Sequence, residues 1–356
     1  MPKLLMDMSD RRPAWSLPAW VPGEVRTALP QGWAFQLMER EADGSGDGVA
    51  SVHPELLAAV RAAEIYLGYG VPPALLRAAT KLKWVHTGTA GVGSALTPEM
   101  LGSAVLFTNS KGIHAPPMGD TALAMILHFS RGLDFGVTAK AAKRWDTGPY
   151  FREDHPLTEL AISTVGVFGF GGIGRQVAMR ARALGARVLA FDRAPEPSTG
   201  VGRVSPVHRA GESDSGLEIL QGESGFHRLL SESDFLVLSA PETPETRGKL
   251  SSAALARMKT TAVLINLSRG SLVDEGALVE ALREGRLRGA GLDVFTEEPL
   301  PPDHPLWTLP NVLLTPHVSA VTRGFWRRQT DLIVENLRRY LAGEELLNLV
   351  DKEAGF

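Results

Sequence analysis

Apolar runs of strand length alternate with amphipathic stretches along most of the chain. In the first third, short apolar runs are separated by stretches whose apolar residues recur at helical spacing. The expected strands are residues 3–8, 33–38, 63–70 and 82–89, and the expected helices are residues 53–60 and 72–79. This alternation is typical of a mostly parallel sheet with helices on its faces.

A second series of the same kind begins after about residue 113. Residues 118–133 are apolar nearly all round, which predicts a buried helix, and a second subunit is one candidate for what covers it. The expected strands are 163–170, 186–191, 235–240, 262–267, 289–295 and 311–316, and the expected helices are 173–184, 226–232, 251–258 and 274–284. The amphipathic stretch 320–342 predicts a long last helix that packs on the first domain.

One segment breaks the second series. Residues 194–225 are rich in glycine, serine and proline and carry no motif with evident chemistry. Such a composition is typical of surface loops. We therefore expect a flexible loop inserted into the second domain.

The composition is that of an ordinary globular protein. The 356 residues are enough for two domains, with 44% hydrophobic and 22% charged residues. A net charge of −3 gives no electrostatic reason to expect nucleic acid or an anionic membrane as a partner. The chain has no cysteine, which excludes disulfides and thiolate metal sites, and we expect no metal. Because no signal peptide and no membrane-length apolar run is evident, we expect a cytoplasmic protein.

A glycine-rich turn follows the first strand of the second series. In "TVGVFGFGGIGRQVA", Gly169, Gly171 and Gly174 form the pattern G-x-G-x-x-G between a strand and a helix, and Asp192 ends the next strand. That context is the dinucleotide-binding fingerprint, in which the helix amino terminus binds the pyrophosphate. Asp192 is suited to the ribose hydroxyls of NAD and repels a 2′-phosphate, whereas the neighbouring Arg193 leaves NADP open.

Three residues with acid–base or anion-binding chemistry lie at the ends of later strands. Arg269 follows strand 262–267, Glu298 follows strand 289–295, and His317 ends strand 311–316. Open α/β sheets bind ligands at this edge. A carboxylate beside His317 favours its protonated form, which can donate to a carbonyl oxygen, while Arg269 can bind the carboxylate of a 2-oxo acid. Taken singly, each is as readily a solvated or structural side chain.

These motifs resemble those of the D-isomer-specific 2-hydroxyacid dehydrogenase family. The blocks "GFGGIGRQVA", "LINLSRGSLVDEGALVEALREGRLRGAGLDVFTEEPL" and "NVLLTPHVSA" match its signatures in content, order and spacing, and the likeness runs from about residue 84 to 340. In that family the residues that match Arg269, Glu298 and His317 bind the substrate carboxylate, tune the histidine and transfer the proton. The resemblance implies the same roles here.

The resemblance also implies contacts to substrate and cofactor. Ala90, Gly91 and Val92 match a loop whose backbone amides receive the substrate carboxylate. The positions that match cofactor contacts are Gly172 and Ile173 at the pyrophosphate, Ala240 and Pro241 at the adenosine, and Leu267, Ser268, Asp293, Ser319 and Ala320 at the nicotinamide.

The implied fold is α/β, with two Rossmann-like doubly wound domains. A cofactor domain of residues 113–318 is inserted into a split, flavodoxin-like substrate domain of residues 1–112 and 319–356, and no regulatory domain is expected after the last helix. Residues 113–157 resemble the family's dimer arm, which implies a homodimer. The implied activity is hydride transfer between NAD(H) and a small D-2-hydroxy acid or 2-oxo acid. The alternative is an NAD(H)-sensing dimeric binding protein of corepressor type, with weak or no turnover.

Overall fold

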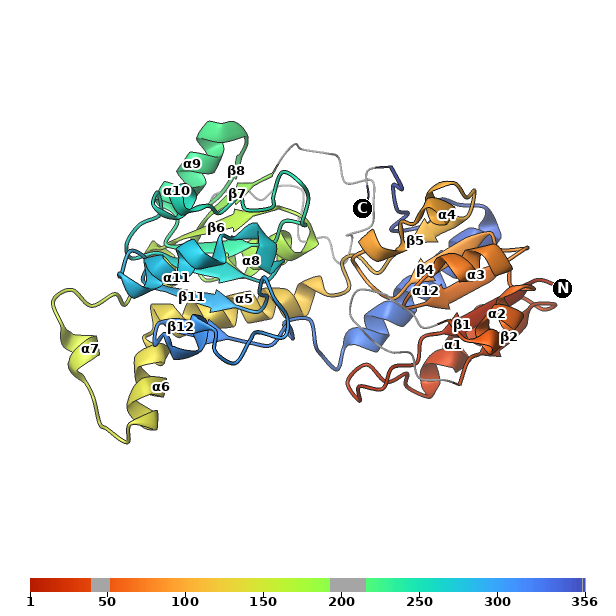
Figure 1. The fold of residues 1–356 in the computed structure, drawn as a ribbon, viewed down its shortest axis with the longest axis horizontal. Helices are drawn as coiled ribbons and strands as arrows, with labels where there is room; N and C mark the ends of the chain where they lie inside the picture. The colour runs from red at the N-terminus through yellow and green to blue at the C-terminus, as the bar shows by residue number, and fades with distance from the viewer. Residues whose placement is uncertain (40–51, 193–215, 354, 356) are drawn as a thin grey trace. The chain divides into compact units, whose positions relative to one another are not determined.

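Two compact units make up the chain. The computed structural model describes residues 1–39, 52–192, 216–353 and 355 (Figure 1). Unit 1 contains Met1–His114 together with the described residues from Val321 onward, and unit 2 runs from Ala115 to Ala320. The chain therefore passes between the units twice, after His114 and after Ala320.

Unit 1 is built on a five-stranded parallel sheet. Its strands are β1 (Lys3–Asp7), β2 (Ala34–Leu37), β3 (Ile65–Gly68), β4 (Trp84–Thr87) and β5 (Leu106–Thr108), in the order β2-β1-β3-β4-β5. This is the flavodoxin-like strand order. Successive residues of β1 face opposite layers: Leu4 and Met6 lie in one apolar cluster, and Leu5 lies in the other.

Helices cover both faces of this sheet. They are α1 (Trp20–Thr27), α2 (Pro54–Val60), α3 (Pro73–Ala78), α4 (Pro98–Leu101), the 3₁₀ turn η1 (Gly93–Ala95) and α12 (Phe325–Ala342). The long helix α12 packs against α1, which confirms the expected return of the chain end to the first unit. The helix begins at Phe325 and not at residue 320, and it ends where Gly343 adopts a positive φ of 70°.

Unit 2 is built on a seven-stranded parallel sheet. Its strands are β6 (Thr164–Phe168), β7 (Arg187–Phe191), β8 (Leu217–Leu220), β9 (Phe235–Leu238), β10 (Val263–Asn266), β11 (Gly289–Leu292) and β12 (Val312–Leu314). They lie in the order β12-β11-β10-β9-β6-β7-β8. The strand order reverses between β6 and β9, as in a doubly wound dinucleotide-binding sheet. The expected α/β fold class is confirmed in both units.

Two apolar layers cover this second sheet. The helices of unit 2 are α5 (Ala115–Ser130), α6 (Leu133–Ala141), α7 (Gly148–Phe151), α8 (Gly172–Ala183), α9 (Gly222–Glu232), α10 (Ser252–Leu255) and α11 (Glu275–Arg283), with the 3₁₀ turns η2 (Leu160–Ile162), η3 (Gly270–Leu272) and η4 (Pro305–Thr308). Helices α5 and α8 pack together on one face, and α9, α10 and α11 cover the other. In the described part of the chain, no helix is long and apolar enough to cross a bilayer.

The helix expected at 118–133 is divided in the structure. Helix α5 ends at Ser130, and α6 begins at Leu133 after Gly132 adopts a left-handed φ of 65°. The left-handed φ favours glycine at position 132, where a Cβ would lie 2.7 Å from the Leu157 side chain. Helix α5 buries, fully or in part, most of the apolar side chains of this stretch, whereas Leu133 and Val137 of α6 are more than half exposed.

The expectation of one loop over 194–225 is wrong at its carboxyl end. Residues 194–215 lie outside the described residues, but Leu217–Leu220 form β8, which pairs with β7, and α9 begins at Gly222. Two of the glycines that suggested a loop instead flank the strand: Gly216 precedes β8 and Gly222 begins α9, and both adopt positive φ. Strand β8 is short and lies at the sheet edge, and Ile219 is largely exposed, so its apolar pattern is weak.

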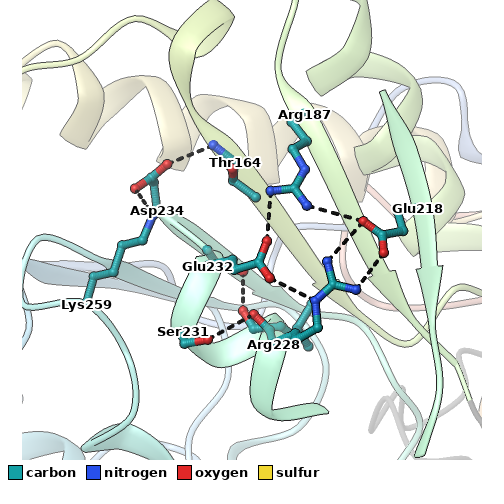
Figure 2. A network of polar contacts seen from close by, with 10 residues as sticks. Thr164, Arg187, Glu218, Arg228, Ser231, Glu232, Asp234 and Lys259 are labelled. Carbon is teal, nitrogen blue, oxygen red and sulfur yellow. Dashed lines mark hydrogen bonds and ion pairs between the residues drawn. The ribbon is translucent and has the colours of Figure 1, made fainter. Parts of the chain in front are cut away.

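An ion-pair network ties this edge strand to its neighbours. Figure 2 shows Arg228 of α9 between Glu218 of β8 and Glu232 of α9, with distances of 2.6 and 2.8 Å. Arg187 of β7 reaches the same two carboxylates at 3.2 and 2.8 Å. Hydrogen bonds from Arg228, and then from Arg187, hold the pKa of both Glu218 and Glu232 below the usual range. The network thus links three elements at the edge of the sheet.

Candidate functional site

The glycine-rich turn lies between β6 and α8. Gly169 has a φ of 95°, and a Cβ there would lie 2.5 Å from Ala240 Cα. A Cβ at Gly174 would lie 2.2 Å from the Gly169 carbonyl oxygen, so both glycines are required by the packing of the protein itself. A Cβ at Gly171 would meet nothing within 4 Å. Open space beside the first turn of α8 fits a pyrophosphate at the helix amino terminus.

Other predicted cofactor residues follow the carboxyl ends of neighbouring strands. Gly172 and Ile173 begin α8, Asp192 follows β7, Ala240 and Pro241 follow β9, and Leu267 and Ser268 follow β10. The Ser268 hydroxyl donates a hydrogen bond to the Ala240 carbonyl, which joins the loops after β9 and β10. These loops lie on both sides of the β6–β9 switch point, where doubly wound sheets bind ligands. Arg193 lies outside the described residues.

Asp293 holds the turn after β12. Its buried carboxylate accepts hydrogen bonds from the Thr315 hydroxyl at 2.6 Å and from the backbone N–H groups of Val318 and Ser319 at 2.9 and 3.0 Å. Its own carbonyl accepts from the His317 N–H at 2.8 Å. Sequence reasoning placed Asp293, Ser319 and Ala320 near the nicotinamide but missed this clamp. A Thr two residues before the histidine is the only sequence signal for it.

The clamped turn presents His317 to Glu298. His317 has a φ of 53°, and its Nδ1 lies 2.7 Å from Glu298 Oε2. The other oxygen, Glu298 Oε1, accepts from the Phe295 N–H at 3.0 Å, so the carboxylate is held at both ends. The side chains of His317 and Glu298 are 47% and 35% exposed. Because Nδ1 faces the carboxylate, Nε2 is the nitrogen left to exchange a proton with a ligand.

Arg269 lies in the loop beside this pair. A Cβ at Gly270 would lie 1.9 Å from the Phe295 carbonyl carbon, so the loops after β10 and β11 are in direct backbone contact. The Arg269 carbonyl accepts from Asn266 Nδ2 at 2.9 Å, and its guanidinium donates to the Ser268 carbonyl at 2.7 Å. Among the described residues, the exposed Arg269 side chain makes no ion pair. No carboxylate of the described residues therefore neutralises this cation.

The predicted carboxylate loop lies in unit 1. Ala90, Gly91 and Val92 follow β4 and lead into η1. Ala90 and Gly91 are exposed, whereas the Val92 side chain is buried in the unit's core. The loop thus presents mainly backbone to the surface.

Comparison with known proteins decides the family. The sequence model of the NAD-binding domain of D-isomer-specific 2-hydroxyacid dehydrogenases matches residues 123–319, more than half of the chain. The chain belongs to this family. The resemblance inferred from the motifs is confirmed, and unit 2 contains its NAD-binding domain.

Curated relatives and solved structures agree with this membership. A glyoxylate reductase of Korarchaeum cryptofilum is 35% identical over 78% of this chain and 79% of the relative. A D-3-phosphoglycerate dehydrogenase of Mycobacterium leprae is also 35% identical, over 85% of this chain but only 53% of the relative. A D-isomer-specific 2-hydroxyacid dehydrogenase of Xanthobacter autotrophicus, solved with NADPH, has a TM-score of 0.76 at 28% identity and covers 100% of this chain and 99% of its own.

Proposed function

We propose that this family member reduces a small 2-oxo acid to the D-2-hydroxy acid, with His317 as proton donor and Arg269 as carboxylate ligand. The observation that carries the proposal is the 2.7 Å contact between His317 Nδ1 and Glu298 Oε2, beside Arg269, which forms no ion pair with any described residue. A proton donor, its carboxylate partner and an anion ligand are the groups that this reduction requires.

Each side chain has a distinct task in this scheme. Arg269 binds the substrate carboxylate and polarises the neighbouring carbonyl. His317 donates its Nε2 proton to the carbonyl oxygen as the alcohol forms, and Glu298 stabilises the imidazolium that donates. The reduced nicotinamide supplies the hydride. In the oxidative direction His317 accepts the proton instead.

The cofactor site fits a dinucleotide. Open space at Gly171 receives the pyrophosphate at the start of α8, and Gly172 and Ile173 supply backbone N–H groups there. Asp192 favours NAD by bonding the adenosine ribose. NADP stays open, since an NADPH-dependent glyoxylate/hydroxypyruvate reductase of Sinorhizobium meliloti, solved with NADP, is 26% identical with a TM-score of 0.73.

We propose glyoxylate or hydroxypyruvate as the first substrates to test. The glyoxylate reductase relative is matched over most of its length, whereas the phosphoglycerate dehydrogenase relative is matched over about half of its length. A phosphorylated substrate calls for additional cations near the carboxylate ligands. Arg327 of α12 does not supply such a free cation, because it is paired with Glu24 and Asp331.

The test is oxidation of NADH in the presence of a panel of 2-oxo acids. The panel contains glyoxylate, hydroxypyruvate, phosphohydroxypyruvate, pyruvate and branched 2-oxo acids, and each assay is repeated with NADPH. One preferred acid with saturable turnover supports the reductase and names its substrate class. Tight NADH binding without turnover of any acid would favour the sensing protein instead.

We also propose a homodimer through residues 113–157. In this region Leu133 and Val137 of α6, Trp145, and Phe151 of α7 are all more than half exposed. Figure 1 shows α6 and α7 standing away from the sheet of unit 2. An apolar arm of this kind fits a second copy of the chain, as monomeric proteins rarely expose so many large apolar side chains together.

A further inference from the structure

Hydrogen bonds from within unit 1 hold three successive carbonyl groups of the loop after β4. Asn109 Nδ2 donates to the Ala90 carbonyl at 2.8 Å, and the Thr89 hydroxyl donates to the Gly91 carbonyl at 2.8 Å. The Ser110 N–H donates to the Thr89 carbonyl at 2.9 Å. Because the peptide unit is planar, each bound carbonyl also fixes the N–H group of the next residue. Three bonds therefore fix the N–H directions of residues 90, 91 and 92.

Those N–H groups have no partner in the part of the chain that the structure describes. Among the described residues, the backbone N–H groups of Ala90, Gly91 and Val92 donate no hydrogen bond. Successive backbone N–H groups form a concave donor set that binds anions. This observation on unit 1 is independent of the family resemblance, and it supports the same residues as carboxylate ligands.

The last segment of the chain, around Asn348, holds the backbone of Asn109, whose side chain binds the middle of this loop. Figure 1 shows that segment beside β5, where Thr108 forms an antiparallel bridge with Leu349. The Asn109 N–H donates to the Asn348 carbonyl at 3.2 Å, and Asn348 Nδ2 donates to the carbonyls of Asn109 at 3.2 Å and Lys111 at 2.7 Å. Asn109 is buried and its Oδ1 accepts from the Lys111 N–H at 3.1 Å.

We infer that Asn109 and Asn348 are positioning residues for the substrate carboxylate. Asn348 orients Asn109, Asn109 orients the Ala90 peptide, and the Gly91 N–H takes its direction from that peptide. Neither asparagine touches the substrate in this scheme. The inference rests on the proposed function, since it takes residues 90–92 as the carboxylate loop.

The test compares steady-state constants of the full-length enzyme and its variants with glyoxylate and NADH. Asn109→Ser removes the Nδ2 donor without adding charge, and we expect it to raise KM about tenfold while kcat changes less than about threefold. Asn109→Asp keeps the acceptor for Lys111 but loses the donor, and it should raise KM at least as much. Asn348→Gly keeps a residue suited to the positive φ of 56° and should raise KM less, because it acts through Asn109.

The double variant and a matched control sharpen the result. Adding Asn348→Gly to Asn109→Ser should raise KM little further, since both changes act on one chain of contacts. Tyr340→Phe removes a 2.9 Å hydrogen bond to Glu64, which directly precedes β3 at the amino end of the strands. This control should leave KM unchanged. A KM increase confined to Asn109→Asp would indicate charge repulsion and overturn the positioning role.

Binding measurements separate this inference from the proposed function. Oxamate, an unreactive isostere of a 2-oxo acid, is titrated by calorimetry into each variant with NADH present, and NADH affinity is measured by fluorescence. Weaker oxamate binding in the asparagine variants with unchanged NADH affinity supports the inference, even where no acid is turned over. Wild-type oxamate affinity in Asn109→Ser overturns it, and wild-type protein that neither binds oxamate nor turns over an acid contradicts both proposals.

Discussion

His317 adopts a backbone conformation that a histidine rarely adopts. Its φ of 53° is in the left-handed region, which costs a residue with a side chain about 1 kcal/mol or more. Three backbone N–H bonds to Asp293, from His317, Val318 and Ser319, hold the turn in place. The fold therefore sustains local strain at the position that faces Glu298.

Replacing the imidazole tests its role as proton donor. We expect His317→Ala to lower kcat by a factor of about 10² to 10⁴, since general acid catalysis typically contributes that much, and to leave NADH binding nearly unchanged. Stopped-flow turnover and NADH fluorescence measure the two effects. His227→Ala, at a partly exposed histidine of α9, serves as control. Full activity in His317→Ala would remove it from the mechanism.

Asp192 is the residue through which cofactor preference is tested. The Asp192→Ala variant loses the ribose ligand and the charge that repels a 2′-phosphate, so the preference for NADH over NADPH should fall by about tenfold. The ratio of kcat/KM values for NADH and NADPH measures this cofactor preference. Asp154→Ala, at an exposed acid in the segment after α7, should leave the ratio unchanged. An unaltered ratio in Asp192→Ala would count against the ribose contact.

The contact between His317 and Glu298 follows from the sequence because both residues come after parallel strands of one sheet. Carboxyl ends of parallel strands share an edge, so strand order alone brings these side chains near one another. The clamp by Asp293 and the backbone contact at Gly270 do not follow in this way. Both depend on the register of β10, β11 and β12, which hydrophobic periodicity leaves open.

The close approach at Gly270 makes the loops after β10 and β11 depend on each other. A Cβ in Gly270→Ala would overlap the Phe295 backbone, so the loops must separate, and we expect a loss of about 1–3 kcal/mol in unfolding free energy together with reduced kcat. Chemical denaturation and steady-state assays measure the two. Gly276→Ala, within α11, is the control. Its Cβ would make only an ordinary contact, 3.6 Å from Asp274 Oδ1, and alanine should stabilise the helix. Equal behaviour of the two variants would refute the argument from loop contact.

The network around Arg228 predicts how the edge of unit 2 responds to acid. The pKa values of Glu218 and Glu232 are lowered in the folded protein, so these carboxylates stabilise it above their unfolded pKa of about 4.3 and lose that effect as the pH falls further. We expect Arg228→Met to lower the melting temperature at neutral pH, and the gap to wild type to close below about pH 4. Arg283→Met, at an exposed arginine of α11, should show no such pH dependence. A gap that stays constant with pH would contradict the network's role.

Strands that bury nearly every residue were predictable from the sequence, whereas β5 and β8 were not. The central strands β6, β9 and β10 bury nearly every residue, which gives the continuous apolar runs seen in the sequence. Strand β8 buries one face only, and β5 has three residues, so neither produces a run of that kind. The ion pairs that attach β8 join residues distant in sequence and have no local signature.

At the scale of the whole chain, two parallel sheets follow from the alternation of strands and helices. The amphipathic stretch 320–342 predicted that the chain end packs on the first domain, because the apolar face of a long helix needs a surface to cover it, and α12 (Phe325–Ala342) does pack in unit 1. The bonds from Asn348 to residues near β5 show a consequence of that return. The last segment of the chain reaches the loop that we propose for the substrate carboxylate.

The arm formed by α6 and α7 predicts the oligomeric state. Val137 and Trp145 are 62% and 97% exposed, and covering them with a second chain removes apolar surface from water. We expect the wild type to sediment as a dimer at micromolar concentration, and Val137→Glu with Trp145→Glu to shift it to a monomer by placing charges in the interface. Leu341→Glu, at an exposed leucine of α12, should remain dimeric. A monomeric wild type would overturn the proposal, whereas a monomeric arm variant that still binds NADH would show that unit 2 folds without its partner.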